Sequence, residues 1–214
     1  MNTGITTGIK EKILVLGNYQ DAMYHPFQGV DKRLEDMLSG LELVCTDRTA
    51  ELLKLEEEGY RGVISYLDIW DSTLTGPEAE ALEDFVRKGG AALVLHNGIS
   101  IQGRERLKDM VGARFLTHPP QEPILFREKS HPITEGCGEF ELSEEPYQFE
   151  MSEDDKEIIL LYLYRGQEYP AGWCKSVGQG RLVFLTPGHT AEIFDCPEYR
   201  KLIQRSMDWC LKKL

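Results

Sequence analysis

The sequence predicts an α/β domain in which helices cover both faces of a mainly parallel sheet, giving a three-layer α/β/α sandwich. Short apolar runs alternate with amphipathic stretches through the first half of the chain, which is the pattern of strand-helix-strand units. The chain has 214 residues, 41% of them hydrophobic, so it is long enough to bury one core and short for more than one. We therefore expect a single domain over residues 11–214. Residues 1–10 are polar and rich in Gly and Thr, and we expect them to be a flexible leader rather than a signal peptide or membrane anchor.

The first half is expected to contain four strands separated by helices. Residues 12–17 read Lys-Ile-Leu-Val-Leu-Gly, a continuous apolar run that is typical of a buried parallel strand. The other predicted strands cover residues 41–46, 62–67 and 91–95. Helical patterns lie between the strands at residues 27–38, 51–58 and 77–88. Pro77 suits the first turn of the third helix, and Gly89-Gly90 suits its end.

The second half is less regular because prolines at positions 119, 120, 123 and 132 interrupt it. Residues 157–164 and 170–177 are predicted strands. The glycines of residues 177–181 favour a hairpin turn into a strand at 182–185. Residues 198–214 have apolar positions at helical spacing, which predicts a closing helix with a core face. We expect this half to extend the parallel sheet with antiparallel, hairpin-linked strands.

Composition excludes several classes of partner. The 36 acidic and 24 basic residues leave a formal charge of −12 without a basic patch, so neither nucleic acid nor an anionic membrane surface is expected to bind. No apolar run approaches the roughly 20 residues that span a bilayer. The five cysteines are an odd number without CxxC spacing, which favours a reducing, cytoplasmic location over a disulfide framework. No GxGxxG follows the first strand, so no bound nicotinamide cofactor is expected.

Four side chains would converge if the sheet is parallel, because loops at the carboxyl ends of parallel strands share one edge. His25 follows the first strand, His96 follows the fourth and His189 follows the strand at 182–185, while Glu145 lies in the acidic run 139–150. Imidazoles and a carboxylate suit proton transfer or a divalent ion such as zinc. We predict His96, Glu145 and His189 as catalytic residues, and His25, His96 and His189 as alternative metal ligands. The simpler interpretation is that the rings only bond loop backbone and that Glu145 belongs to a solvated face.

Further residues are predicted to contact a substrate. Tyr147 lies two positions after Glu145, on the same side of an extended chain, and its phenol suits a hydroxyl-rich ligand. Asn97 follows His96, and His118 is a candidate pocket wall although His-Pro steps are often rigid turns. His25 is placed with this group as well. Trp70 and Trp173 could stack on sugar rings, but an aromatic residue is more often core.

Several of these segments, in this order, resemble the trehalose-utilisation (ThuA-like) family. The matching features are the first strand with His25, Gly89-Gly-Ala-Ala-Leu-Val-Leu-His-Asn-Gly, His131-Pro-Ile-Thr-Glu-Gly, Glu144-Glu-Pro-Tyr, Trp173, and Gly178-Gln-Gly-Arg-Leu-Val-Phe-Leu-Thr-Pro-Gly-His before a helix with Asp208-Trp209. The resemblance implies the flavodoxin-like fold of class I glutamine amidotransferases. In those enzymes a cysteine nucleophile follows the fourth strand, whereas this chain has His96-Asn97-Gly98 there, so glutaminase chemistry is not expected. Glu144 and Asn97 differ from the aspartate and serine that are common in the family.

The resemblance implies a role in carbohydrate metabolism, with trehalose-type glycosides or their oxidised keto forms as ligands. Acid/base or metal-assisted chemistry on a sugar is the hypothesis that the candidate residues favour. A non-enzymatic sugar-binding or assembly subunit is an alternative, and so is a hydrolase with a displaced nucleophile such as Ser100. The sequence is compatible with a homo-oligomer and with a subunit that works beside a partner dehydrogenase. An enzyme requires the histidines and Glu145 around one pocket.

Overall fold

A computed structural model of the chain describes residues 9–22 and 24–214. Residues 1–8 of the expected leader lie outside the described residues. In the described part, the larger of two sheets has nine strands. In spatial order these are β2 (Glu42–Thr46), β1 (Lys12–Gly17), β3 (Gly62–Tyr66), β4 (Ala91–Leu95), β11 (Gly180–Leu185), β10 (Gln167–Val177), β9 (Lys156–Tyr164), β6 (Glu122–Glu128) and β7 (Phe140–Glu144). The smaller sheet pairs β5 (Ala113–Thr117) with β8 (Gln148–Met151).

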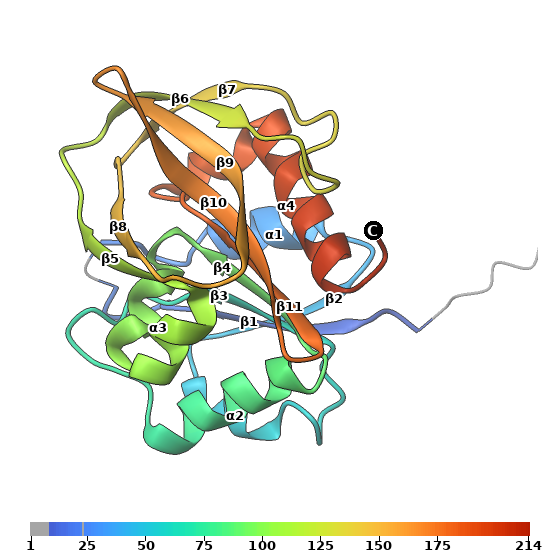
Figure 1. Cartoon of the computed structure of the whole chain (residues 1–214). Coiled ribbons are helices and arrows are strands. Elements are labelled where there is room, and N and C mark those ends of the chain that lie inside the picture. The colour runs from blue at the N-terminus through green and yellow to red at the C-terminus, as the bar shows by residue number, and fades with distance from the viewer. Residues whose placement is uncertain (1–8, 23) are drawn as a thin grey trace, which may run out of the picture.

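The larger sheet changes from parallel to antiparallel pairing at β11. Strands β2, β1, β3, β4 and β11 pair in parallel. Strands β11, β10, β9, β6 and β7 pair antiparallel. This confirms the predicted parallel centre and antiparallel, hairpin-bearing second half. It also brings the carboxyl ends of β1, β3, β4 and β11 to one edge of the sheet (Figure 1).

Helices cover both faces of the parallel half, as the three-layer prediction requires. One face carries α1 (Val30–Met37), α4 (Pro197–Cys210) and the 3₁₀ helix η3 (Ala191–Asp195). The other carries α2 (Gly76–Arg87), α3 (Glu105–Val111) and the 3₁₀ helix η1 (Thr49–Lys54). Figure 1 shows α1 and α4 on the opposite side of the sheet from α2 and α3. Thr75 and Glu78 form a capping box at the start of α2, which satisfies backbone N–H groups that the first helical turn leaves unpaired.

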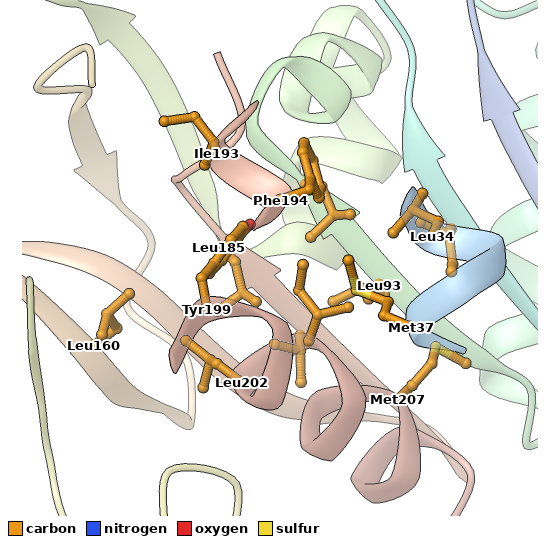
Figure 2. Packing of buried hydrophobic residues seen from close by; sticks show 14 of the residues in the cluster. Leu34, Met37, Leu93, Leu160, Leu185, Ile193, Phe194, Tyr199, Leu202 and Met207 are labelled. Carbon is orange, nitrogen blue, oxygen red and sulfur yellow. The ribbon is translucent and has the colours of Figure 1, made fainter. Parts of the chain in front are cut away.

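The continuous apolar strands supply both layers of the core because successive side chains point to opposite faces. In β4, Leu93 and Leu95 pack beneath α1 and α4, whereas Ala92 and Val94 pack toward α2 and α3. Figure 2 shows the first of these layers, with Leu93 between Met37 of α1 and the α4 side chains Tyr199 and Leu202. Burial on both faces explains why these strands lack an alternating polar pattern.

The structure differs from the predicted elements in several places. The helical pattern at 51–58 is the short 3₁₀ helix η1 followed by turns, because Leu52 and Leu55 are the side chains that this segment buries. No element was predicted between residues 96 and 156, where the structure has the 3₁₀ helix η2 (His96–Gly103), helix α3 and strands β5 to β8. Pro123 lies inside β6 rather than in a loop. The pairing of β6 with β9 begins only at Leu125, so at Pro123 one side of the strand is unpaired and tolerates a missing N–H donor. No helix in the described ranges is long and apolar enough to cross a membrane.

Candidate functional site

Three histidines meet at the edge of the sheet where the parallel strands end. His25 lies in the loop after β1, His96 directly follows β4, and His189 follows β11. Because β1, β3, β4 and β11 are neighbours in the sheet, these loops lie side by side. Glu145 reaches the same place from the connection between β7 and β8. The four residues, called the His–Glu cluster below, are brought together although 164 positions separate His25 from His189.

One atom of each cluster residue points to a common centre. His25 Nε2 lies 3.1 Å from His96 Nε2 and 3.3 Å from His189 Nδ1. Glu145 Oε2 lies 3.3 Å from His189 Nδ1, 3.6 Å from His96 Nε2 and 3.9 Å from His25 Nε2. All four atoms are within 4.8 Å of one another. For comparison, tetrahedral zinc with bonds of about 2.1 Å separates its ligand atoms by about 3.4 Å.

Hydrogen bonding around the cluster also fits a cation. His96 Nδ1 lies 2.7 Å from the Thr186 carbonyl, to which it donates its proton, so the neutral ring turns the lone pair of Nε2 toward the cluster. Glu145 Oε2 is buried without a hydrogen-bond partner, and burying a carboxylate oxygen in this way is costly unless a positive charge faces it. The four donor atoms therefore suit a divalent ion held by nitrogen and oxygen.

Two buried carboxyl groups, those of Asp68 and Glu144, hold the histidine-bearing loops by accepting hydrogen bonds from their backbone N–H groups. Asp68, at the end of β3, accepts the backbone N–H groups of Tyr24 and His25 at 3.1 and 3.0 Å, and its Oδ2 lies 3.4 Å from His25 Nδ1. Glu144 accepts the N–H groups of Gly188 and His189 at 3.2 and 2.7 Å. Each carboxylate thus fixes two successive amides of a loop that carries a cluster histidine.

Glu144 also connects two of the cluster loops. Its Oε2 has no hydrogen-bond partner and lies 3.5 Å from His96 Nδ1, while its Oε1 holds the loop of His189. The side chain is fully buried. Burial raises the pKa of this carboxyl group to about 8, so near neutral pH it is mostly uncharged and acts by holding the loop of His189 in place.

Backbone geometry lets the loops approach one another closely. His96 has a φ of 46°, an αL conformation that is uncommon for residues other than glycine, at the turn that directly follows β4. A Cβ on Gly98 would lie 2.1 Å from the Ser65 carbonyl oxygen, and one on Gly188 would lie 2.7 Å from His96 Cβ. Gly98 therefore allows the turn after β4 to pack against β3, and Gly188 allows the turn after β11 to pack against His96.

Burial and charge act in opposite directions on the cluster. Burial lowers the pKa of His96 to about 4, so this imidazole is neutral near neutral pH. Burial acts to lower the pKa of His25 too, but the nearby carboxylates of Asp68 and Glu145 raise it above its ordinary value. Burial acts to raise the pKa of Glu145, but the three histidines outweigh it and hold that pKa far below its usual range. Glu145 is therefore ionised, and it supplies the negative charge of the cluster.

A pocket of about 360 Å³ opens onto one side of the cluster. It is lined by Tyr24, His25, Trp70, Phe115, His118, Glu145 and Tyr147. The volume lies in the range of small-molecule sites, and such sites combine apolar walls with a few converging polar groups.

The other predicted residues divide into those at the pocket and those away from it. Tyr147 lines the pocket, and its hydroxyl lies 3.1 Å from His96 Nε2. His118 is a pocket wall, with Nδ1 3.5 Å from Glu145 Oε1. Asn97 is fully buried and donates to the Tyr66 carbonyl at 2.8 Å, so it points into the protein and does not line the pocket. We do not include Asn97 in the proposed site.

Two further candidates lie in structural positions. Ser100 donates to the Leu67 carbonyl and accepts from the Ile69 N–H, so its hydroxyl has no histidine partner that could activate it as a nucleophile. Trp173 is fully buried, stacks on Phe184 and donates to the Val111 carbonyl. Its ring cannot meet a sugar. Trp70 does line the pocket.

Sequence reasoning did not select Asp68, Glu144 or Phe115. Asp68 directly follows the third predicted strand, so the strand-end argument that identified His96 could have found it. Glu144 is hidden in an acidic run whose other members include exposed glutamates such as Glu141 and Glu150. Phe115 lies on β5, a strand without a sequence signal.

Comparison with known proteins gives one family and many similar folds. The model of the trehalose utilisation (ThuA) family matches residues 13–210. No curated protein matches.

Several solved structures are similar in fold. A ThuA-like protein from Bacteroides uniformis is 18% identical with a TM-score of 0.77, over 95% of this chain and 92% of the other. A ThuA-like protein from Parabacteroides merdae is 15% identical with a TM-score of 0.74, over 96% and 91%. A protein of Salmonella typhimurium described as cytoplasmic is 12% identical with a TM-score of 0.69, over 94% and 99%. At these identities the likeness concerns the fold, which is flavodoxin-like and class I glutamine amidotransferase-like, as predicted.

Proposed function

Since this chain belongs to the trehalose utilisation (ThuA) family, we propose that it is a divalent-metal-dependent enzyme acting on a small, uncharged carbohydrate. The observation that carries the proposal is the His–Glu cluster, whose four donor atoms lie within 4.8 Å of one another at the end of a pocket. Metal-free acid/base chemistry would not require four such atoms to face a common centre. Zinc is the ion that three imidazoles and one carboxylate suit best.

The proposed roles follow from the contacts of each residue. His25, His96, His189 and Glu145 would hold the metal, and Asp68 and Glu144 would keep their loops in place. A bound divalent ion would polarise a carbonyl or hydroxyl oxygen of the ligand and stabilise the negative charge that develops there. Tyr147 faces both His96 and the pocket, and burial raises the pKa of its phenol well above the ordinary value. It therefore remains a neutral hydrogen-bond donor toward a sugar oxygen.

The charge balance of the pocket supports an uncharged ligand. Its lining has no lysine or arginine among the residues that the structure describes. A phosphate or carboxylate on the ligand would therefore meet no lysine or arginine, only the proposed cation and its histidines, whose charge Glu145 partly offsets. Trehalose-type glycosides and their keto forms meet this requirement. A keto group with a neighbouring hydroxyl would also offer two oxygens to one cation, so we propose keto-sugars as the favoured class.

The proposal is tested with metal analysis and turnover on the same protein samples. The parent, loaded with zinc or manganese, should retain about one ion per chain and convert trehalose or its keto form, as followed by NMR of the sugar. His189→Ala and Glu145→Gln should lose both the ion and the conversion. His131→Gln changes a histidine away from the cluster and should keep both. A parent that retains no divalent ion at micromolar concentration would contradict the proposal, and one that binds the sugar without converting it would instead be a sugar-binding subunit.

A further inference from the structure

One wall of the pocket consists of aromatic rings that have no role in the proposed metal binding. Three ring-to-ring steps lead outward from the cluster: His96 to Tyr147 at 4.5 Å, Tyr147 to Phe115 at 4.5 Å, and Phe115 to Trp70 at 5.0 Å between ring centroids. Each of the last three residues lines the pocket. The wall therefore extends two rings beyond Tyr147, away from the residues that would hold the metal.

The outer part of this wall consists of aromatic rings that the core leaves partly accessible. Trp70 and Phe115 are half-buried, and Tyr24, which lines the pocket next to His25, is 61% exposed. Aromatic side chains of this size stabilise a fold mainly by being buried. Rings that remain accessible beside a cavity can instead cover the apolar C–H face of a ligand, since an aromatic surface contributes large contact area at low conformational cost.

We propose that Tyr24, Trp70 and Phe115 form a second subsite, which binds the ring attached to the reacting sugar, so that the site takes glycosides in preference to free monosaccharides. This inference rests on the proposed function, because the cluster defines which sugar ring reacts. The first ring would lie against Glu145, His118 and Tyr147 and the second against the aromatic rings. A second pyranose and an aryl group share the required flat apolar face, and separate probes distinguish them.

The test measures how much a second ring adds to binding. Calorimetric titration with methyl α-glucoside, trehalose and 4-nitrophenyl α-glucoside compares one ring with two. The parent should bind at least one of the two-ring probes about tenfold more tightly than methyl α-glucoside, the gain typical of one aromatic contact. Trp70→Ala and Phe115→Leu should reduce this preference to about twofold or less, leaving the affinity for methyl α-glucoside and the metal content unchanged.

The matched control is Leu116→Ala. Leu116 is 56% exposed, follows Phe115 at an irregularity in the β5–β8 pairing, and is not among the residues that line the pocket. This variant should keep the preference for two rings.

Equal affinities for all three probes in the parent, or an equal loss for all three in Trp70→Ala, would overturn the subsite while metal retention still supported the proposed function. A parent without metal that nevertheless prefers two rings, and loses that preference in Trp70→Ala, would support the subsite and reject the metal. A parent that binds none of the probes would overturn the subsite and the carbohydrate assignment together.

Discussion

At the scale of single residues, His96 shows how surroundings rather than residue type set the chemistry. Its Nδ1 bonds the Thr186 carbonyl, and burial keeps the ring neutral by lowering its pKa to about 4. His25, 3.1 Å away, has its pKa raised instead by Asp68 and Glu145. The two imidazoles therefore differ in proton affinity although both are buried. Desolvation of the fully buried His96 outweighs the Glu145 charge 3.6 Å away, whereas Asp68 and Glu145 together outweigh the burial of His25.

The carboxylates behind the cluster should act on metal affinity rather than on folding. Asp68→Asn keeps an oxygen that can accept the loop N–H groups but removes the charge beside the His25 ring. Burial raises the pKa of Glu144 to about 8, so Glu144→Gln replaces a carboxyl group that is mostly neutral near pH 7. Metal affinity, measured by competition with a chelating dye, should fall about 10- to 100-fold for Asp68→Asn and less for Glu144→Gln. Asp71→Asn changes an exposed acid a few positions away and should leave the affinity unchanged. Equal losses in Asp68→Asn and Asp71→Asn would mean that only overall charge matters.

His131, away from the cluster, should contribute to acid sensitivity. Burial lowers its pKa below the ordinary value, so the unfolded chain takes up the proton first as the pH falls. Stability from the neutral ring is therefore present above about pH 6.5 and is lost as the pH falls from there toward the folded-state pKa. In His131→Gln, the side-chain amide oxygen can still accept the Ile133 N–H that Nδ1 accepts at 3.1 Å. Between pH 7.5 and 5.5 the metal-free parent should lose more of its melting temperature than this variant, and identical losses would contradict the assignment.

At the scale of elements, the site depends on short turns after parallel strands. The strands are buried on both faces and rigid, so the turn after each one determines where its histidine points. The turn after β11 shows this dependence because Gly188 has a φ of 150° and sits against His96. Secondary structure alone therefore does not place the cluster, and the fit between neighbouring turns does.

Gly188→Ala should displace His189 from the His–Glu cluster. The added Cβ would meet His96 Cβ at 2.7 Å, so the turn must move and take His189 with it. Metal binding should be lost, and the free energy of unfolding should fall by about 1–3 kcal/mol. Gly138→Ala is the matched control, because its φ of 81° imposes strain while nothing lies within 4 Å of the new Cβ. Denaturant unfolding with metal titration compares them, and retained metal binding in Gly188→Ala would refute this role of the turn.

At the scale of the whole molecule, the site joins the two halves of the sheet. The parallel half contributes the three histidines and Asp68, and the antiparallel half contributes Glu144, Glu145 and Tyr147 through the β7–β8 connection. A ligand that binds residues from both halves stabilises their relative placement, since it binds the folded chain and not the unfolded one.

Metal should therefore raise the stability of the entire chain. Zinc at about 100 times its dissociation constant adds about 2.7 kcal/mol, which corresponds to a rise of about 5–10 °C in melting temperature for a chain of this size. A chelator should reverse the rise. Glu145→Gln should melt close to the metal-free parent and show little response to zinc, whereas Glu141→Gln should respond like the parent. A rise of the same size in Glu145→Gln would place the bound ion elsewhere.

The sequence by itself determined the architecture and the candidate histidines. Continuous apolar runs such as residues 91–95, alternating with amphipathic stretches, predicted parallel strands buried on both faces, and the polar loops after these runs were expected at the edge where such strands end. Hence His25, His96 and His189 could be selected together. Only the tertiary structure decided which residues next to these histidines belong to the site. Asn97 adjoins His96 but turns into the core, whereas Glu144 lies fully buried among exposed acids of similar sequence. The physical reason is that the burial of a strand follows from the local pattern of apolar residues. The distances among His25, His96, His189 and Glu145 depend instead on the packing of loops that lie up to 164 positions apart in the chain.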